Sequence, residues 1–329
     1  MGRRYFAYGS NICAEQMALR CPAAVPLGLA DLPGWRFALN RRGVATLLEE
    51  PAACASGLLW DLSRACEEAL DRYEGVASDV YRRAEIEVAG APALVYLAAE
   101  TRPGAARPGY LERILAACGR LGLPATGIEP WARPVQAWLV REVLAGYWLD
   151  LGGIHGPAHW LRVRANGLAL AARTPGADAG VVELFALLHD SRRQTEDHDF
   201  GHGERAAAYA QQLARDGLLR LDPGRLDTLA TACAGHEHGG TSADPTIGCC
   251  WDADRLELSR LYRRPIARLL STEAARDPGL QGEAWRRGVG ELLDIEGATA
   301  WGVGHLFAEG AANRGDVSHE KSVARRWRP

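Results

Sequence analysis

Short apolar stretches separated by glycine or proline dominate the first part of the chain. Most are rich in β-branched or aromatic residues, which favours strands. We therefore expect strands at residues 4–8, 35–39, 44–48, 55–62, 81–88 and 93–98. One helix is predicted over residues 64–73, with Ser63 as its N-cap, one apolar face and Gly75 as its stop. A second is predicted over residues 108–121, before Gly122.

From about residue 135 onward the apolar positions take helical spacing. Helices are predicted at residues 135–149, 156–172, 181–189, 203–213, 222–236 and 247–262. The proline-containing stretch 128–134 marks the boundary between the two patterns. The sequence thus predicts an α+β protein of two domains, residues 1–134 and 135–310, followed by a polar and then basic tail, residues 311–329.

Composition narrows the class of protein. A length of 329 residues suits two domains, and 47% hydrophobic with 24% charged residues is typical of folded chains. A net charge of −3 offers no basic footprint for nucleic acid or an anionic membrane. No apolar run is long enough to span a bilayer, and the N-terminal residues lack the apolar core of a secretory signal. Eight cysteines without a C-x-x-C pair are typical of reduced thiols, so we expect a cytoplasmic protein.

Two elements of the first domain carry candidate chemistry. The strand at residues 4–8 leads into Gly9-Ser10-Asn11, where glycine permits close approach of a ligand and successive N–H groups can bind an anion. An ordinary turn at a strand end is the alternative. Glu74 ends the amphipathic helix between Tyr73 and Val76, and a carboxylate in a partly apolar pocket has a raised pKa that suits proton transfer. The alternative is a solvated glutamate at a helix end.

The motifs YFAYGSN, SGLLWDL, DRYEGV and ALVYLA, taken in this order, resemble the gamma-glutamylcyclotransferase-like family over residues 5–128. The resemblance implies a small mixed β-barrel with flanking helices. It also implies that a γ-glutamyl α-amine attacks its own γ-carbonyl, which releases an amine or amino acid and leaves 5-oxoproline. Glu74 matches the catalytic acid/base, and the reaction needs no cofactor. Pocket residues carried over from the family are Tyr8, Gly9, Ser10, Asn11 and Tyr81. Asp79 stands where relatives often have glycine, which would alter what the pocket accepts, and the γ-glutamyl substrate stays open.

Histidines and aspartates gather in the second domain. Seven of the nine histidines lie between residues 154 and 239. His155 and His159 are one helical turn apart, and His189-Asp190 ends an apolar helix. A buried Asp–His pair is costly unless a partner satisfies both groups, and a metal ion does so. Imidazole and carboxylate ligands suit iron, manganese, nickel or zinc.

The order H…HD…H…H…D resembles the HD-domain metallohydrolase superfamily over residues 151–262, which implies an all-α helical bundle. The four signature ligands are His159, His189, Asp190 and Asp254, with Asp254 preferred to Asp252 because A-D-R-L is the common family pattern. His202 and His236 match the extra histidines of binuclear members, although His198 or His238 could replace them. We therefore expect a divalent, binuclear metal cofactor, iron foremost, with manganese, nickel or zinc as alternatives.

The chemistry of this second site stays open. In a hydrolase, two metals clamp phosphate oxygens, and Arg192 and Arg193 could bind the phosphate unless they are surface charges. In an oxygenase, the same six ligands hold a mixed-valence di-iron pair. His155 could contact substrate or pack locally. Cys249 and Cys250 could bind zinc, but core packing is the simpler reading.

The sequence as a whole predicts a bifunctional enzyme acting on small molecules: a γ-glutamyl compound in one domain and a phosphate ester or nucleotide in the other. One alternative makes only the HD domain catalytic, with the first domain as a binding module. Another is a regulatory protein whose HD domain senses a nucleotide. Neither substrate follows from the sequence, nor do the metal, any coupling of the sites, or the oligomeric state.

Overall fold

The computed structural model describes residues 2–292 and 294–306, and the predicted tail at residues 311–329 lies outside them. The chain divides into two compact units. The first comprises Met1–Arg133 and Gln212–Leu221, and the second comprises Pro134–Gln211 and Asp222–Pro329. The segment 212–221 is thus grouped with the first unit, and it includes the last turn of helix α7 (His202–Arg215).

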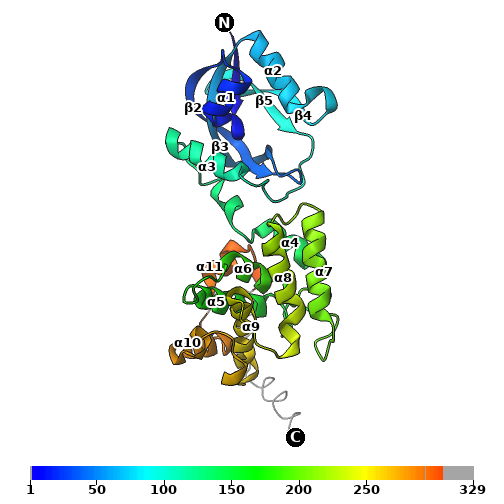
Figure 1. Cartoon of the computed structure of the whole chain (residues 1–329). Coiled ribbons are helices and arrows are strands. Elements are labelled where there is room, and N and C mark those ends of the chain that lie inside the picture. The colour runs from blue at the N-terminus through cyan, green and yellow to red at the C-terminus, as the bar shows by residue number, and fades with distance from the viewer. Residues whose placement is uncertain (1, 293, 307–329) are drawn as a thin grey trace. The chain divides into compact units, whose positions relative to one another are not determined.

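A five-stranded mixed sheet forms the first unit (Figure 1). Its strands are β1 (Arg3–Ala7), β2 (Val25–Leu39), β3 (Ala45–Leu62), β4 (Tyr81–Val88) and β5 (Ala91–Ala98), in the order β2-β3-β1-β5-β4. The central strand β1 runs antiparallel to β3, with Tyr5 opposite Trp60, and parallel to β5, with Tyr5 opposite Leu94. The mixed sheet with helices that the resemblance implies is therefore confirmed.

The predicted small mixed β-barrel is wrong, because the sheet is not closed and has β2 and β4 at its edges. Both edges carry features that oppose further pairing. On β4 the side chains of Arg82, Arg83, Glu85 and Glu87 are exposed, and charges of this kind protect an edge strand. On β2 the register shifts after Pro26 and after Pro33, because proline has no N–H to donate to a ladder.

Local signals predicted several elements of this unit. Helix α2 (Arg64–Glu74) begins at Ser63, whose side chain accepts from the Cys66 N–H, and ends at Gly75 in the left-handed conformation with φ of 65°. Helix α3 (Tyr110–Leu121) ends at Gly122. By contrast, the two strands expected at residues 44–48 and 55–62 form the single strand β3, and helix α1 (Ala14–Arg20) was not predicted.

The core of the first unit lies around β1. Phe6 and Ala7 are fully buried there, and Leu70 of α2 and Ile114 of α3 pack into the same cluster. Burial of one such leucine, isoleucine or phenylalanine side chain contributes about 1.5–3 kcal/mol. This packing fixes the C-terminal end of β1, from which the loop at Gly9 begins.

Helices make up the second unit: α4 (Ala137–Ala145), α5 (Pro157–Ala171), α6 (Ala179–Leu188), α7 (His202–Arg215), α8 (Pro223–Gly235), α9 (Pro245–Leu256), α10 (Pro278–Gly288) and α11 (Ile295–Ala300). Every residue of α6 from Val181 to Leu188 is buried, and α5, α8 and α9 pack against it (Figure 1). The predicted helix at residues 247–262 ends earlier, at Leu256, where a 3-10 turn follows. Among the described residues, no helix combines the length and the apolar character needed to cross a membrane.

Candidate active site and candidate metal centre

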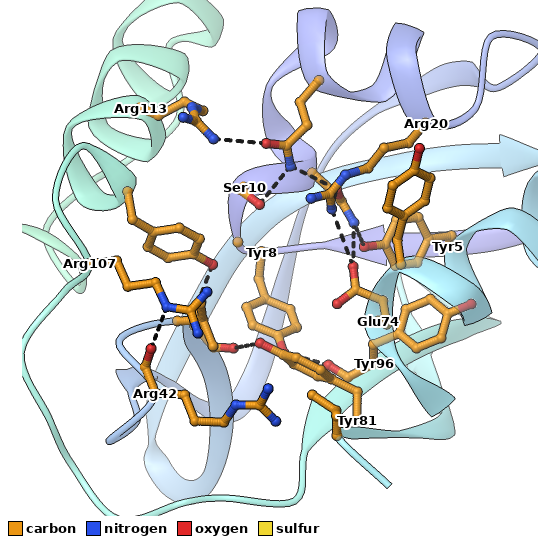
Figure 2. Close-up of a pocket in the computed structure, with 18 of the residues that line it drawn as sticks. Tyr5, Tyr8, Ser10, Arg20, Arg42, Glu74, Tyr81, Tyr96, Arg107 and Arg113 are labelled. Carbon is orange, nitrogen blue, oxygen red and sulfur yellow. Dashed lines mark hydrogen bonds and ion pairs between the residues drawn. The ribbon is translucent and has the colours of Figure 1, made fainter. Parts of the chain in front are cut away.

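A pocket of about 390 Å³ opens in the first unit at the end of β1 (Figure 2). The residues predicted for this site come to it from separate elements: the loop after β1, the last residue of α2 and the first residue of β4. All of them line the pocket: Tyr8, Gly9, Ser10, Asn11, Glu74 and Tyr81.

The Glu74 carboxylate is held by two polar neighbours. Asn11 Nδ2 donates to Glu74 Oε1 at 3.0 Å, and Arg20 Nη1 lies 3.6 Å from the same oxygen. The Glu74 side chain is only 14% exposed. Burial raises the pKa of Glu74, and the nearby Arg20 charge and the Asn11 hydrogen bond partly offset this rise. A carboxylate in this state is suited to accepting a proton and returning it.

Asn11 organises the pocket from inside the protein. It is buried, its Nδ2 also donates to the Tyr5 hydroxyl at 2.9 Å, and its Oδ1 accepts from Arg20 at 2.8 Å and from Gln16 at 3.1 Å. Its amide is therefore engaged by protein groups, and its hydrogen bond holds the Glu74 carboxylate in place.

Tyrosine rings and one glycine shape the rest of the pocket. The Tyr8 hydroxyl donates to the Tyr96 carbonyl, and the Tyr81 hydroxyl donates to the Ala45 carbonyl at 2.7 Å. Burial raises the pKa of both hydroxyls, so they stay protonated. A Cβ at Gly9 would lie 3.1 Å from Ala45 Cβ, so a larger residue there would crowd the pocket.

Asp79 lies outside the set of residues that line the pocket, contrary to the expectation that its carboxylate affects what the pocket accepts. Its φ is 53°, a left-handed conformation that glycine favours and aspartate tolerates. The backbone thus explains why glycine is suited to this position. Basic side chains of the pocket that the sequence did not single out are Arg20, Arg42, Arg107 and Arg113.

The second unit brings all six predicted metal ligands into two adjoining groups. His159, His189 and Asp254 form one group, and Asp190, His202 and His236 form the other. Within each group the ligand atoms lie within 4.8 Å of one another. The side chains come from α5, α9, the start of α7 and the turns that follow α6 and α8.

Asp190 lies between the two groups, with one carboxylate oxygen toward each. Its Oδ2 is 3.3 Å from His159 Nε2 and 3.7 Å from His189 Nε2. Its Oδ1 is 3.2 Å from His202 Nε2 and 3.6 Å from His236 Nε2. Within the described part of the chain, Asp190 Oδ1 is a buried oxygen without a hydrogen-bond partner. A metal ion bound to this oxygen would satisfy it, whereas the Arg193 guanidinium approaches it only to 3.5 Å.

The four histidines are oriented from outside by acceptors at Nδ1. These acceptors are Glu257 Oε2 at 2.8 Å from His159, the Phe185 carbonyl at 3.2 Å from His189, the Asp199 carbonyl at 2.6 Å from His202, and the Cys233 carbonyl at 2.7 Å from His236. Because these oxygens only accept, each Nδ1 carries a proton, and in the neutral ring each Nε2 presents a lone pair inward.

Two inward pairs of Nε2 atoms follow from this orientation. They are 3.0 Å apart between His159 and His189 and 2.9 Å apart between His202 and His236. Lone pairs that face each other at this distance repel unless a cation lies beside them. The donor set therefore fits a divalent metal, and nitrogen with carboxylate oxygen is typical of iron, manganese, nickel or zinc sites.

Neighbouring candidates lie outside these two groups. Asp252 accepts from the Ser271 and Thr272 N–H groups at 2.8 and 2.7 Å, so it is a structural residue. His198 stacks on Phe200, and His238 lies with Glu204 and Glu237 in a separate, more exposed group. Cys249 and Cys250 are buried free thiols, as core packing predicts.

The remaining polar candidates, Arg192, Arg193 and His155, differ in what their side chains contact. Arg193 is buried, and its Nη1 lies 3.5 Å from Asp190 Oδ1. Arg192 donates to the Gly146 carbonyl and stacks on the Tyr209 ring at 3.5 Å, so its guanidinium is engaged elsewhere. His155 Nδ1 lies 2.7 Å from Glu196 Oε2, and its ring is 6.1 Å from that of His159.

Comparison with known proteins bears on the first unit. Residues 5–112 match the family model described as "Gamma-glutamyl cyclotransferase, AIG2-like". The gamma-glutamylcyclotransferase of Bos taurus is 33% identical to this chain over 94 residues, and that of Homo sapiens is 32% identical to it over 95 residues. Each alignment covers 26% of this chain and 50% of the relative, so the chain spans about half the length of the curated relatives it matches. The first unit thus contains an AIG2-like gamma-glutamyl cyclotransferase domain.

Two solved structures resemble parts of the chain. A gamma-glutamyl cyclotransferase is 26% identical with a TM-score of 0.37, covering 40% of this chain and 87% of that chain. A protein from an uncultured Thermotogales bacterium, described as a "predicted HD superfamily hydrolase", is 25% identical to this chain with a TM-score of 0.34, covering 46% of this chain and 83% of that chain. At these TM-scores neither structure defines the fold of a unit, so the second site must be judged by its ligand geometry.

Proposed function

We propose that the first unit cyclises a γ-glutamyl compound to 5-oxoproline and releases the amine or amino acid bound to the γ-carboxyl group. The observation that carries this proposal is the buried Glu74 carboxylate, held by Asn11 and Arg20 at the pocket. The relatives that match this part of the chain carry the name of the same activity.

The reaction moves two protons from the α-nitrogen of the substrate to the leaving nitrogen. Glu74 takes a proton from the substrate α-ammonium, and the freed amine nitrogen attacks the γ-carbonyl carbon of the same molecule. The new C–N bond closes a five-membered ring, and Glu74 returns its proton to the leaving nitrogen as the bond to that nitrogen breaks. The ring nitrogen gives up its second proton, which the released amine takes up, so a neutral lactam and an ammonium group result. Because attacking and attacked atoms belong to one molecule, correct orientation supplies much of the acceleration. The loop Tyr8–Asn11 would hold the glutamyl end.

Release of 5-oxoproline from a panel of γ-glutamyl compounds, measured with a metal chelator present, tests this proposal. Turnover under these conditions supports it. Saturable binding of γ-glutamyl compounds without any 5-oxoproline would instead show that the unit is a binding module.

We further propose that the second unit is an HD-type metal-dependent hydrolase of a small phosphate ester or nucleotide. His159, His189 and Asp254 would hold one metal, His202 and His236 the other, and Asp190 would contact both. Divalent metals in such a pair polarise a phosphoryl oxygen and lower the pKa of water. Arg193 would be the arginine that binds a phosphate, because its Nη1 lies 3.5 Å from Asp190 Oδ1, although its guanidinium also donates to the Thr195 and Asp197 carbonyls.

Metal content and oxidation state of protein purified without oxygen test the second proposal. Two spectroscopically silent, manganese or nickel ions per chain support a hydrolase. Two irons with a mixed-valence EPR signal would favour oxygenase chemistry on the same ligands. A single tightly held metal would remove His202 and His236 from the ligand set, and no metal after reconstitution would refute the centre.

A further inference from the structure

We propose that the amine released by the first unit carries at least two negative charges, as an acidic amino acid or a phosphorylated amine does, and that Arg42 and Arg107 recognise them. This inference rests on the proposed cyclisation, because it identifies the substrate class of the same pocket.

The charge balance of the pocket is the first observation. Four arginines line it, Arg20, Arg42, Arg107 and Arg113, whereas Glu74 is the single carboxylate among its lining residues. Arg20 is engaged by Asn11 and Glu74, and Arg113 donates to Gln16 Oε1 at 3.1 Å. Among the residues that the structure describes, neither Arg42 nor Arg107 has a carboxylate partner. Two guanidinium groups at one pocket therefore lack a counter-charge from the protein.

The backbone builds this arginine pair. The two residues are 65 positions apart, yet Arg107 Nε donates to the Arg42 carbonyl at 2.7 Å and the Arg107 N–H donates to the Gly43 carbonyl at 3.0 Å. Gly43 has a φ of 76°, and a Cβ there would lie 2.8 Å from Arg107 N. The buried Asn40 accepts from the Arg42 N–H at 3.0 Å. The turn thus places both arginines together at the pocket.

The pair lies where the leaving amine would extend. Figure 2 shows Arg42 and Arg107 on the side of the pocket away from Glu74, with Tyr8 and Tyr81 between them and the carboxylate. Ring closure must occur beside Glu74, and a leaving group that extends across the tyrosine rings would reach the arginines. The glutamyl head is zwitterionic, with one ammonium and one carboxylate, and adds no net charge.

The number of negative charges on the leaving amine then decides how well it matches the two arginines. A simple amine brings none, a neutral amino acid brings one carboxylate, and an acidic amino acid or a phosphorylated amine brings two. Guanidinium groups bind carboxylate and phosphate through paired hydrogen bonds, which are among the stronger contacts available in water. Two acidic groups would satisfy both arginines.

The test measures kcat/KM for 5-oxoproline release from γ-glutamyl-ethylamine, γ-glutamyl-alanine and γ-glutamyl-glutamate, whose leaving groups carry zero, one and two negative charges. We expect a rise of about tenfold for each charge, equivalent to about 1.4 kcal/mol. γ-Glutamyl-phosphoethanolamine then separates phosphate from carboxylate recognition. Arg42→Ala and Arg107→Ala should each reduce the preference for γ-glutamyl-glutamate over γ-glutamyl-ethylamine about tenfold. Arg82→Ala, an exposed arginine on β4 away from the pocket lining, should leave the preference unchanged.

The outcomes separate this inference from the function on which it rests. Equal kcat/KM across the charge series, with 5-oxoproline formed, overturns the inference and leaves the cyclisation standing. A charge preference that survives in both arginine variants also overturns it. No 5-oxoproline from any of the four compounds overturns both. A rise with charge that is reduced in the Arg42 and Arg107 variants but retained in the Arg82 variant supports both.

Discussion

Replacement of Glu74 by glutamine isolates proton transfer from every other property of the first pocket. Glutamine has nearly the same volume, and its carbonyl oxygen can still accept the 3.0 Å hydrogen bond from Asn11. Binding should therefore change little. Loss of a positioned general acid/base lowers turnover by about 10²–10⁴-fold, which corresponds to about 3–5 kcal/mol of barrier. We expect kcat for 5-oxoproline formation to fall by this factor, with a smaller change in KM.

The pH dependence gives a second signature of the same residue. Glu74 must be ionised to accept a proton, so kcat/KM should rise with pH through its pKa. Because burial raises that pKa, the acidic limb of the kcat/KM profile should lie above the ordinary value of 4.5.

The raised pKa of Glu74 also means that ionisation of this carboxyl group opposes folding. Relative to Glu74→Gln, the unmodified chain should lose stability as pH rises from about 4.5 through the raised pKa, and the two should be alike below that range.

Steady-state kinetics and thermal unfolding of the full chain, each followed across pH, measure both signatures. Glu68→Gln is the matched control, because Glu68 lies on the same helix with a side chain that is 57% exposed. The reasoning is refuted if Glu74→Gln keeps more than a tenth of the kcat, or if Glu68→Gln loses as much. An acidic limb at or below 4.5 would contradict the effect of burial.

Three further predictions concern metal binding and stability. Asp254→Asn and Asp252→Asn form a matched pair on α9. Asp254→Asn should lower the amount of bound metal found by elemental analysis. Asp252→Asn should keep the metal but cost about 1–3 kcal/mol of unfolding free energy, because Asp252 accepts three hydrogen bonds. The reverse pattern would reassign the ligand. Asp190→Asn should reduce metal at both positions, since each oxygen faces one group, and loss of a single equivalent would show that it serves only one. Gly75→Ala should cost about 1 kcal/mol in denaturant unfolding, because its φ is 65° and a Cβ would meet Val80 at 3.0 Å, and an unchanged midpoint would refute this cost.

The sequence by itself determined the features that depend on neighbouring residues. The Ser63 cap, the Gly75 stop and the apolar face of α2 follow from local rules, and all three are present. The sequence also identified the metal-ligand candidates, since burial of a His-Asp pair at the end of an apolar helix costs free energy unless a partner satisfies both groups. Helical and strand periodicity also depends on neighbouring residues, so it distinguished the two halves of the chain.

Only the tertiary structure decided which distant residues meet. It opened the sheet at two protected edges instead of closing a barrel, and it separated Asp252, which caps backbone N–H groups, from Asp254, which faces the histidines. It also joined Arg42 to Arg107 through a turn at Gly43. Periodicity describes the face of one element, whereas such contacts depend on how several elements pack and on where each buried polar group finds its partner. For that reason the charge of the first pocket was visible only once the chain was folded.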